Sequence, residues 1–440
     1  MSIEELLREI DSRTSSIQAP HFGPLVNWGQ SMSMPIQRWF RYREAYSPLL
    51  VQELQLGTKI LDPFCGCGST LIGAARTNRT ASGIDINPLA IHVARVKTTP
   101  LSQRQLQAAA DYLVCFRQNI DVVECWPTPE LSITEKVFEP DILVCILQLR
   151  QSLEDYSRTD SVLRSFLLLA WLAVLEQVGS YFKEGNGIKY RRRKRTPNGY
   201  VEQLDGKWQE QRFGLNQRQF VLETFASQLS LMLDDTSMWD RGIWRAQESD
   251  IGDALDLAAK YAGQSFDDIV FSPPYANRFD YFESQKVELW FGNFVNSYDD
   301  LIELRKRSVR SHLAADLKKP VLTNRVLEAL IDNMDRNSSS WRMRVPLALR
   351  GYFADMTEVL QNCFSVLRSG GRCHIVVGNS AFGGVIFPAD SLLAVLAEEI
   401  GYADISINIV RHLTVAPQQR SALNGLQSYM RESIVQMTRP

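Results

Sequence analysis

The sequence predicts an α/β fold in which a doubly wound parallel sheet is interrupted by largely helical insertions. Two short apolar stretches, Lys59–Leu61 and Ala81–Ile84, are each followed by a segment with helical character. A strand-helix-strand-helix order is how parallel sheets begin. The pattern returns at Asp268–Phe271 and at Cys373–Val377, far along the chain. We therefore expect one sheet whose strands come from distant parts of the sequence.

The remaining elements follow from apolar spacing and from helix-ending signals. Helices are predicted at Thr70–Arg76, Asn87–Lys97, Ser161–Val178, Gly351–Leu367 and Ser391–Ile400. The pair Gly370-Gly371 is expected to end the fourth of these helices. Further strands are predicted from Glu248 onward, at Ile405–Val410 and at Ser433–Met437.

The composition of the 440 residues is that of an average globular protein, with 45% hydrophobic and 22% charged residues. This excludes a disordered chain, a fibre and a small disulfide scaffold. The longest apolar run, Phe166–Leu175, is about half of the roughly 20 residues that cross a bilayer. No basic segment followed by an apolar one opens the chain. We therefore expect a cytoplasmic protein that does not bind membranes. Because the net charge is only −2, any nucleic-acid binding needs local basic patches.

The seven cysteines and five histidines do not form a metal-ligand pattern. No Cys-x-x-Cys pair occurs, and the histidines are spread along the chain, whereas structural zinc sites use closely spaced ligands. We expect a reduced protein without a bound metal. Cys65 and Cys67 are interpreted as small residues that fill a tight loop.

A glycine-rich turn, Asp62–Ser69 (DPFCGCGS), directly follows the first predicted strand. Glycines let the backbone approach a ligand closely and direct helix N-terminal amides toward it. Asp85 ends the next strand, where doubly wound sheets place a carboxylate that accepts hydrogen bonds from a ribose diol. Turn and carboxylate together predict an adenosine-containing cofactor. A tight turn without a ligand is the alternative for the glycine pattern alone.

A second motif, Ser272–Tyr275 (SPPY), follows the strand at Asp268–Phe271. Its two prolines stiffen a loop at the carboxyl edge of the sheet, where open α/β sheets bind their ligands. The Ser272 hydroxyl and the Pro273 carbonyl can both accept hydrogen bonds, which suits an exocyclic amino group. Tyr275 supplies a flat face on which a base can stack.

The combination of DPFCGCGS, GIDINP and SPPY resembles the S-adenosylmethionine-dependent DNA amino-methyltransferases, and SPPY resembles the cytosine-N4 branch. The resemblance covers roughly residues 30–100, 246–282 and 346–440. It implies a Rossmann-like class I methyltransferase sheet and S-adenosylmethionine as cofactor. Cys67 and Ser69 stand where the family usually has serine and threonine.

The resemblance assigns two groups of site residues. The cofactor would be held by Asp62, Phe64, Gly66, Gly68, Asp85 and Asp253. Among these, Asp62 would lie near the methionine amino group and Asp253 would contact the adenine amino group. The catalytic residues would be Ser272, Pro273, Pro274 and Tyr275. The segment Arg38–Pro48 resembles the one that packs beside the methionine end of the cofactor.

The resemblance implies that the target base is flipped out of double-stranded DNA and attacks the methyl group through its amino nitrogen. No Pro-Cys dipeptide, the signature of carbon-5 cytosine methyltransferases, is present. The open alternatives are an adenine-N6 DNA methyltransferase, an RNA base methyltransferase and an inactive DNA-binding relative. A restriction endonuclease or other defence protein is the expected partner, and the nucleoid the expected location.

A strongly basic stretch is the predicted nucleic-acid-binding element, although a solvated charge run is its alternative. Its residues are Lys189, Arg191, Arg192, Arg193, Lys194 and Arg195. A second basic stretch comprises Arg305, Lys306, Arg307 and Arg310. We expect a catalytic domain from residues 1–100, 246–282 and 346–440. Residues 101–245 would then form a target-recognition insertion, and residues 283–345 a lid or second DNA contact.

Overall fold

The computed structural model describes residues 2–440 with some gaps. These gaps are residues 119, 186, 192, 196–200, 204–209, 211, 215, 240–243, 245–246, 320, 322–323, 416–418, 420 and 424. Arg192 of the predicted DNA-binding stretch therefore lies outside the described residues, and so do the side chains of Arg193, Lys194 and Arg195.

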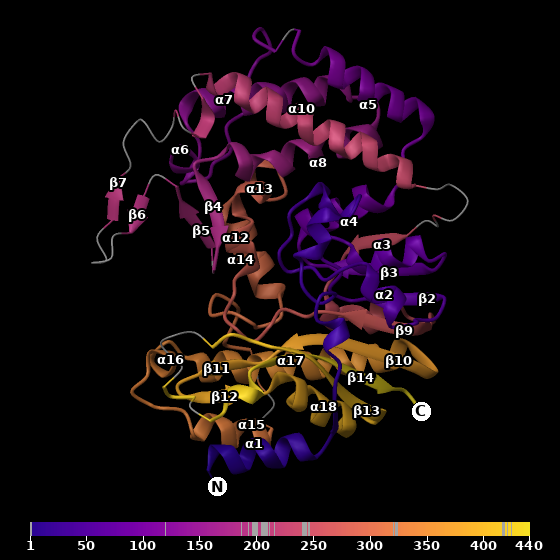
Figure 1. Ribbon diagram of the computed structural model, residues 1–440, viewed down its shortest axis with the longest axis vertical. Helices are drawn as coiled ribbons and strands as arrows, with labels where there is room; N and C mark the ends of the chain where they lie inside the picture. Colours follow the sequence, from indigo (N-terminus) through magenta and orange to yellow (C-terminus); the bar gives the residue numbers. More distant parts are fainter. Residues whose placement is uncertain are drawn as a thin grey trace.

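An eight-stranded sheet forms the centre of the lower half of the molecule in Figure 1, in the order β1-β13-β14-β10-β9-β2-β3-β8. The strands are β1 (Ser15–Gln18), β13 (Ala403–His412), β14 (Arg431–Thr438), β10 (Leu367–Gly378), β9 (Phe266–Phe271), β2 (Lys59–Asp62), β3 (Thr80–Asp85) and β8 (Glu248–Ile251). Neighbouring strands of this sheet run parallel, except that β14 runs antiparallel to both β10 and β13. The predicted Rossmann-like α/β fold is confirmed.

The order of the strands reverses between β2 and β9. From β2 the chain continues outward to β3 and then β8, whereas β9 leads to β10 on the other side. In open α/β sheets, ligands bind at such a switch point, outside the carboxyl ends of the strands. The glycine-rich turn follows β2 and the SPPY loop follows β9, so both predicted motifs lie at this point.

Alternating residues of the central strands divide the sheet core between two faces. In β9, Ile269 and Phe271 pack with α17 (Val345–Val366) and α18 (Ala389–Ile400) on one face. Val270, between them, points to the other face and packs against α2 (Leu49–Glu53) and α3 (Ser69–Arg76). The middle of the sheet is therefore buried on both sides, which is why its central strands are mainly apolar.

The longest helix of this core begins and ends earlier than predicted. α17 begins at Val345 and ends at Val366, and the chain passes directly into β10 at Leu367. The prediction that Gly370-Gly371 ends the helix is wrong, because both glycines lie within β10. They fall where the pairing between β10 and β9 shifts register, between Leu367 and Arg372.

A layer of long helices lies above the sheet in Figure 1. It contains α5 (Gln103–Cys115), α7 (Pro140–Tyr156), α8 (Ser161–Val178) and α10 (Gln217–Asp235). Two hairpins adjoin it, β4 (Tyr181–Glu184) with β5 (Gly187–Tyr190) and β6 (Arg193–Arg195) with β7 (Val201–Gln203). Among the described helices, α8 alone is long enough and apolar enough to cross a membrane, judged by length and composition. Two thirds of it is buried inside this layer, as in a core helix.

Residues 283–345 contribute to both halves of the molecule. α13 (Lys286–Phe291) and α14 (Tyr298–Arg307) pack into the apolar core of the helical layer. α15 (Arg325–Asp332) packs instead into the core that covers one face of the sheet. This segment therefore links the helical layer to the sheet. The predicted domain boundaries at residues 100, 245, 282 and 345 stay a prediction.

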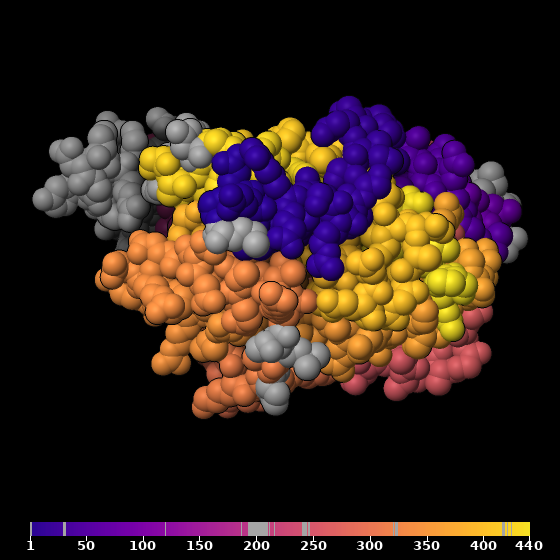
Figure 2. All heavy atoms as spheres, turned by 90° about the horizontal axis from the view of Figure 1, so that it is seen from below, coloured from indigo at the N-terminus to yellow at the C-terminus, as the bar shows by residue number. Residues whose placement is uncertain are grey.

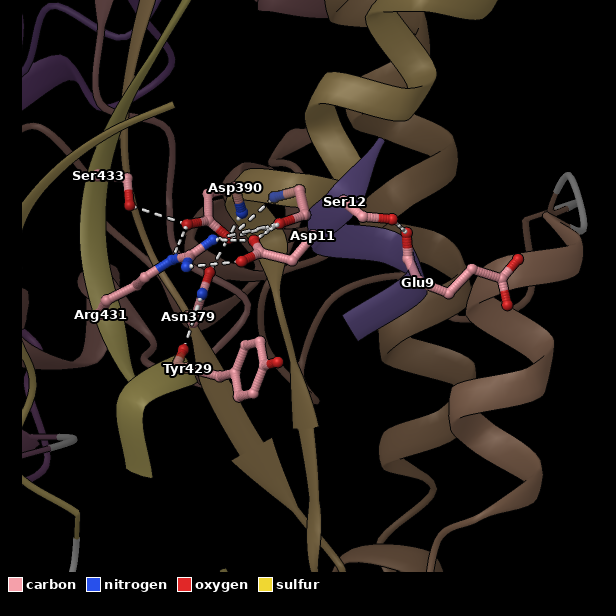
Figure 3. A network of polar contacts seen from close by, with 9 residues as sticks. Glu9, Asp11, Ser12, Asn379, Asp390, Tyr429, Arg431 and Ser433 are labelled. Carbon is pink, nitrogen blue, oxygen red and sulfur yellow. Dashed lines mark hydrogen bonds and ion pairs between the residues drawn. The ribbon is translucent and has the colours of Figure 1, made fainter. Parts of the chain in front are cut away.

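The two ends of the described chain are joined by a buried polar network (Figure 3). Arg431 of β14 donates to Asp390 at the start of α18 over 2.7 Å and pairs with Asp11 of α1 (Ile3–Ser12). Ser433 donates to the same Asp390 carboxylate over 2.8 Å. Figure 2 shows the N-terminal segment, in indigo, lying across the orange and yellow C-terminal part of the chain. The network fixes both the N-terminal helix and the register of β14.

Candidate active site

A cavity of about 320 Å³ opens at the switch point of the sheet, beside the carboxyl ends of β2, β3 and β9. It brings together nine of the ten predicted cofactor and catalytic residues. These are Asp62, Phe64, Gly66, Asp85, Asp253, Ser272, Pro273, Pro274 and Tyr275. Segments distant in sequence, around residues 26–28, 42–46 and 307–312, complete the wall.

Gly68 is the predicted cofactor residue that does not line the cavity. Its φ of +88° is left-handed, and it caps the N-terminus of α3. A Cβ atom at this position would lie 3.0 Å from the Cβ of Ala94 on α4 (Pro88–Thr98). Gly68 therefore lets the loop turn into α3 while α3 and α4 pack closely, and the structure gives it no place in the cavity wall.

Gly66 faces the cavity and is tied to the neighbouring strand. Its φ is +48°, and its N–H donates a 2.9 Å hydrogen bond to Asp85. The other Asp85 oxygen accepts a 2.9 Å hydrogen bond from the N–H of Asn87. Asp85 thus holds the glycine loop and the start of α4 in place while lining the cavity. Burial raises the pKa of Asp85 to about 6.

Asp62 lies deeper and is almost completely buried. It accepts hydrogen bonds from the N–H of Phe64 (3.0 Å), the hydroxyl of Tyr46 (3.2 Å) and the hydroxyl of Thr70. Burial nevertheless raises the pKa of Asp62 to about 7. Tyr46 belongs to the Arg38–Pro48 segment, which the structure brings against the glycine loop. A Cβ atom on Gly66 would lie 3.4 Å from the ring of Tyr42, which belongs to the same segment.

Asp253 follows β8 and caps a short turn of helix. Its carboxylate accepts a 3.0 Å hydrogen bond from the N–H of Leu255, and burial raises its pKa. Asp253 and Arg307, of the second basic stretch, both line the cavity. The predicted Asp253 is therefore at the cavity.

The SPPY loop directs Tyr275 toward the strands at the C-terminal end of the chain. The Tyr275 hydroxyl donates a 2.8 Å hydrogen bond to Glu432 of β14, and Glu432 in turn accepts from Arg411 of β13. Burial, and then the Glu432 carboxylate, raises the pKa of Tyr275 well above its usual value. Glu432 and Arg411 both line the cavity, and sequence analysis missed them.

Sequence analysis also missed an aromatic wall that follows SPPY. Phe279 and Tyr281 line the cavity, and their rings meet edge to face with centroids 4.7 Å apart. Trp28 lines it from the N-terminal segment. The sequence ANRFDYF directly after SPPY was a local signal for the first two rings, whereas Trp28 had none.

The two residues of the first basic stretch whose side chains are described, Lys189 and Arg191, do not line the cavity. Lys189 is exposed on β5, and no described residue of the stretch lines the cavity wall. Arg191 is half-buried: its Nε donates to the Tyr181 carbonyl over 2.7 Å, and its guanidinium stacks on Phe182. Arg191 therefore stabilises the β4–β5 hairpin. A role of the whole stretch in DNA binding stays a prediction.

The second basic stretch divides into paired and open charges. Arg305 pairs with Asp280 (2.6 Å), Lys306 with Glu303 (2.6 Å) and the buried Arg310 with Asp355 (2.6 Å). Arg307 is exposed and is the one member of the four that lines the cavity. In the part of the chain that the structure covers, no group of His, Cys, Asp and Glu side chains could hold a metal ion.

No family model matches the chain. It is 24% identical over 414 residues to the type II methyltransferase M.AvaI of Nostoc sp. (strain PCC 7120), covering 86% of this chain and 81% of that protein. It is 23% identical over 457 residues to the type II methyltransferase M.BsoBI of Geobacillus stearothermophilus, with 94% and 88% covered. The chain is related to type II methyltransferases.

M.MvaI of Kocuria varians, also a type II methyltransferase, is 19% identical over 362 residues, covering 77% of this chain and 74% of its own. An rRNA methyltransferase, aviRa from Streptomyces viridochromogenes, covers 93% of the chain at 10% identity and a TM-score of 0.30, too low to support a conclusion. The predicted resemblance to methyltransferases is confirmed at this general level. The cytosine-N4 branch and the role of each site residue stay predictions.

Proposed function

We propose that this protein is a site-specific DNA methyltransferase that transfers the methyl group of S-adenosylmethionine to N4 of a flipped-out cytosine. The observation that carries the proposal is the meeting of the glycine-rich turn and the SPPY loop in one cavity at the switch point of the sheet. Similarity to type II methyltransferases over most of the chain supports the same reaction class and the use of DNA.

The cofactor half of the cavity suits S-adenosylmethionine by its donor set. Burial raises the pKa of Asp62 to about 7 and that of Asp85 to about 6, so a cationic ligand beside these carboxyls would favour their ionised forms. Phe64 and Asp253 line the same cavity. When bound, S-adenosylmethionine supplies an electrophilic methyl group on a sulfonium. The protein residues supply binding and orientation.

The base half suits an exocyclic amino group. The Ser272 hydroxyl and the Pro273 carbonyl can accept its two hydrogens, which localises the nitrogen lone pair that is otherwise delocalised into the ring. Tyr275 offers a stacking face, and Phe279 and Tyr281 close the same cavity. Because this nitrogen is hidden in duplex DNA, the base has to leave the helix to reach the cavity. Ser272, the first residue of SPPY, favours cytosine over adenine as the target base, because SPPY resembles the motif of the cytosine-N4 branch.

The test uses the full chain, unmethylated plasmid DNA and labelled S-adenosylmethionine. The treated DNA is digested to nucleosides, and the methylated base is identified by mass spectrometry. N4-methylcytosine is the expected product. N6-methyladenine would show that adenine, the alternative, is the target base. Methylation of RNA but not DNA would show that the substrate is RNA. Absence of methyl transfer to both DNA and RNA would contradict the proposal. Glu399→Ala, on the exposed side of α18, is a control that should methylate normally.

The proposed domains and partners follow from this reaction. Residues 101–245 would recognise the target sequence, and residues 283–345, which link the helical layer to the sheet, would form a second DNA contact. A restriction endonuclease that cuts the same sequence would be the functional partner, as the type II relatives suggest. The protein would then act in the cytoplasm, at the nucleoid.

A further inference from the structure

Three neighbouring strands place a row of residues beside the Tyr275 ring. Glu432 of β14 lies directly opposite Gly378 of β10 and directly opposite Arg411 of β13. Directly opposed residues of antiparallel strands point to the same face of the sheet. Arg411, Glu432 and Gly378 therefore form one line across the sheet, on the face that carries the SPPY loop.

Each member of this row has a defined relation to Tyr275. A Cβ atom on Gly378 would lie 2.9 Å from the Tyr275 ring, so only glycine leaves room for the ring there. One Glu432 oxygen accepts the Tyr275 hydroxyl over 2.8 Å, and the other accepts Nε of Arg411. The Glu432 side chain is 4% exposed, whereas that of Arg411 is 40% exposed. Arg411 therefore lines the cavity while part of its side chain is open to solvent.

We propose that Glu432 is a positioning residue for the target nucleotide. One carboxylate oxygen fixes the plane of the Tyr275 ring, on which the base stacks. The other oxygen holds Arg411, whose remaining N–H groups point to the mouth and bind the phosphate of the flipped nucleotide. This inference rests on the proposed function and deepens it, because it assigns residues to the nucleotide that the SPPY motif alone does not supply.

Charge and rigidity both favour this role. A buried carboxylate is costly unless it is paired, and Arg411 is the cation that pairs with Glu432. A phenylalanine could stack equally well, but it could not make the hydrogen bond that the tyrosine hydroxyl donates to Glu432. On the opposite face of β14, Arg431 and Ser433 are held by Asp390 (Figure 3). β14 therefore cannot shift its register against β10 and β13, and so displace Glu432, without breaking that network.

The first experiment measures single-turnover methyl transfer on a DNA fragment that the wild-type protein methylates, together with S-adenosylmethionine affinity by calorimetry. Glu432→Ala should slow transfer by about tenfold or more, because the ring and Arg411 lose their shared acceptor, while cofactor affinity changes by less than about twofold. Glu432→Gln should slow transfer less than Glu432→Ala does, because its carboxamide oxygen still accepts the Tyr275 hydroxyl although its NH2 group cannot accept from Arg411. Glu399→Ala is the matched control.

A double-mutant cycle separates positioning from a general structural effect. In a Tyr275→Phe background, Glu432→Ala should slow transfer by a smaller factor than it does in the wild type, because the bond between the two side chains is already gone and only the contact with Arg411 is left to lose. Gly378→Ala should displace the Tyr275 ring while leaving Glu432 intact, and it should slow transfer as Glu432→Ala does. This variant keeps the test valid if Glu432→Ala fails to fold. Arg411→Met should weaken DNA binding and lower the log–log salt slope by about 0.9.

The outcomes distinguish this inference from the proposed function. Wild-type transfer rates in both Glu432→Ala and Gly378→Ala would overturn the positioning role while leaving the methyltransferase intact. Fully additive effects of Glu432→Ala and Tyr275→Phe would overturn it as well. An unchanged salt slope in Arg411→Met would overturn the phosphate contact. A wild-type protein that methylates neither DNA nor RNA would overturn the proposed function, and this inference with it.

Discussion

The Asp85 carboxylate accepts a 2.9 Å hydrogen bond from the Gly66 N–H and thereby ties the end of β3 to the glycine-rich loop that follows β2. Two predicted cofactor residues, Gly66 and Asp85, are thus linked by a direct hydrogen bond. The loop that would carry the cofactor depends on the carboxylate that would hold its ribose. Substitutions at Asp85 should therefore affect loop geometry as well as direct binding.

Asp85→Ala should weaken S-adenosylmethionine binding strongly. The change removes an acceptor of charge-assisted hydrogen bonds, each worth about 1.5–3 kcal/mol, and releases the Gly66 loop. Calorimetry should show a loss of affinity of roughly tenfold to a hundredfold. Unchanged affinity would contradict the cofactor assignment. Asp250→Ala, at an exposed position on β8, is the control that should bind normally.

Cofactor affinity should depend on pH through Asp62 and Asp85. Burial raises their pKa values to about 7 and about 6, from a usual value of 3.8. A cationic ligand favours the ionised carboxylates, so binding should release protons and should be weaker at about pH 5.5 than at about pH 8. Calorimetry in buffers of different ionisation heat counts these protons. Binding that releases no protons in this range would contradict the arrangement.

The same raised pKa values affect the stability of the ligand-free protein. Between about pH 4 and about pH 7, these two groups bind more protons in the folded protein than in the unfolded chain. The free energy of unfolding should therefore fall as pH rises through this range. Asp62→Asn should remove the part of this dependence that lies closest to pH 7. Urea unfolding of wild type and variant at several pH values measures it.

Ser272→Ala should lower the rate of methyl transfer more than it lowers DNA affinity. The hydroxyl matters most when the amino nitrogen localises its lone pair, so its loss affects the transition state more than the bound substrate. Single-turnover kinetics combined with equilibrium DNA binding separates the two quantities. A wild-type transfer rate would exclude the proposed role for this hydroxyl.

Arg431→Ala should destabilise the fold. It leaves the Asp390 carboxylate, which has no exposed surface, without its cation, and breaking a buried pair in this way costs about 3–5 kcal/mol. Arg8→Ala, which breaks an exposed pair with Glu4 on α1, is the control and should change stability little. Urea unfolding compares them, and equal stability of the two variants would show that the network is not a structural anchor.

Neutralising Lys189, Arg193, Lys194 and Arg195 together should weaken DNA binding and reduce its salt slope by about 0.9 for each lost phosphate contact. Arg191→Ala should instead lower thermal stability, because Arg191 holds the β4–β5 hairpin through Tyr181 and Phe182. A wild-type salt slope in the fourfold variant would mean that this stretch does not touch the DNA backbone.

The parts of the site that could be predicted from the sequence are those encoded locally. DPFCGCGS and SPPY each follow an apolar strand, so their position at the sheet edge follows from their neighbours in sequence. Glu432 and Arg411 had no such signal, because their role depends on the cross-strand register of β14 with β10 and β13. Register between distant strands cannot be read from one sequence by periodicity.

The fold shows the same division. The central strands β2, β3 and β9 are apolar and were predicted close to their observed bounds. β1 was missed because all four of its residues are exposed, so no apolar alternation marks it. The β4–β5 hairpin was not predicted, because this region was interpreted only through its basic residues, although Asn186-Gly187 is a sequence signal for a hairpin turn.

The antiparallel strand β14 has a consequence for when the site can form during synthesis. Residues 431–438 are near the C-terminal end of the chain, yet they fill the gap between β10 and β13 and carry Glu432. While these residues are still inside the ribosome, the sheet stays split and Tyr275 lacks its acceptor. α1 likewise lacks its partner Arg431 until then. The cavity is therefore complete only after residues 431–438 have left the ribosome and paired with β10 and β13.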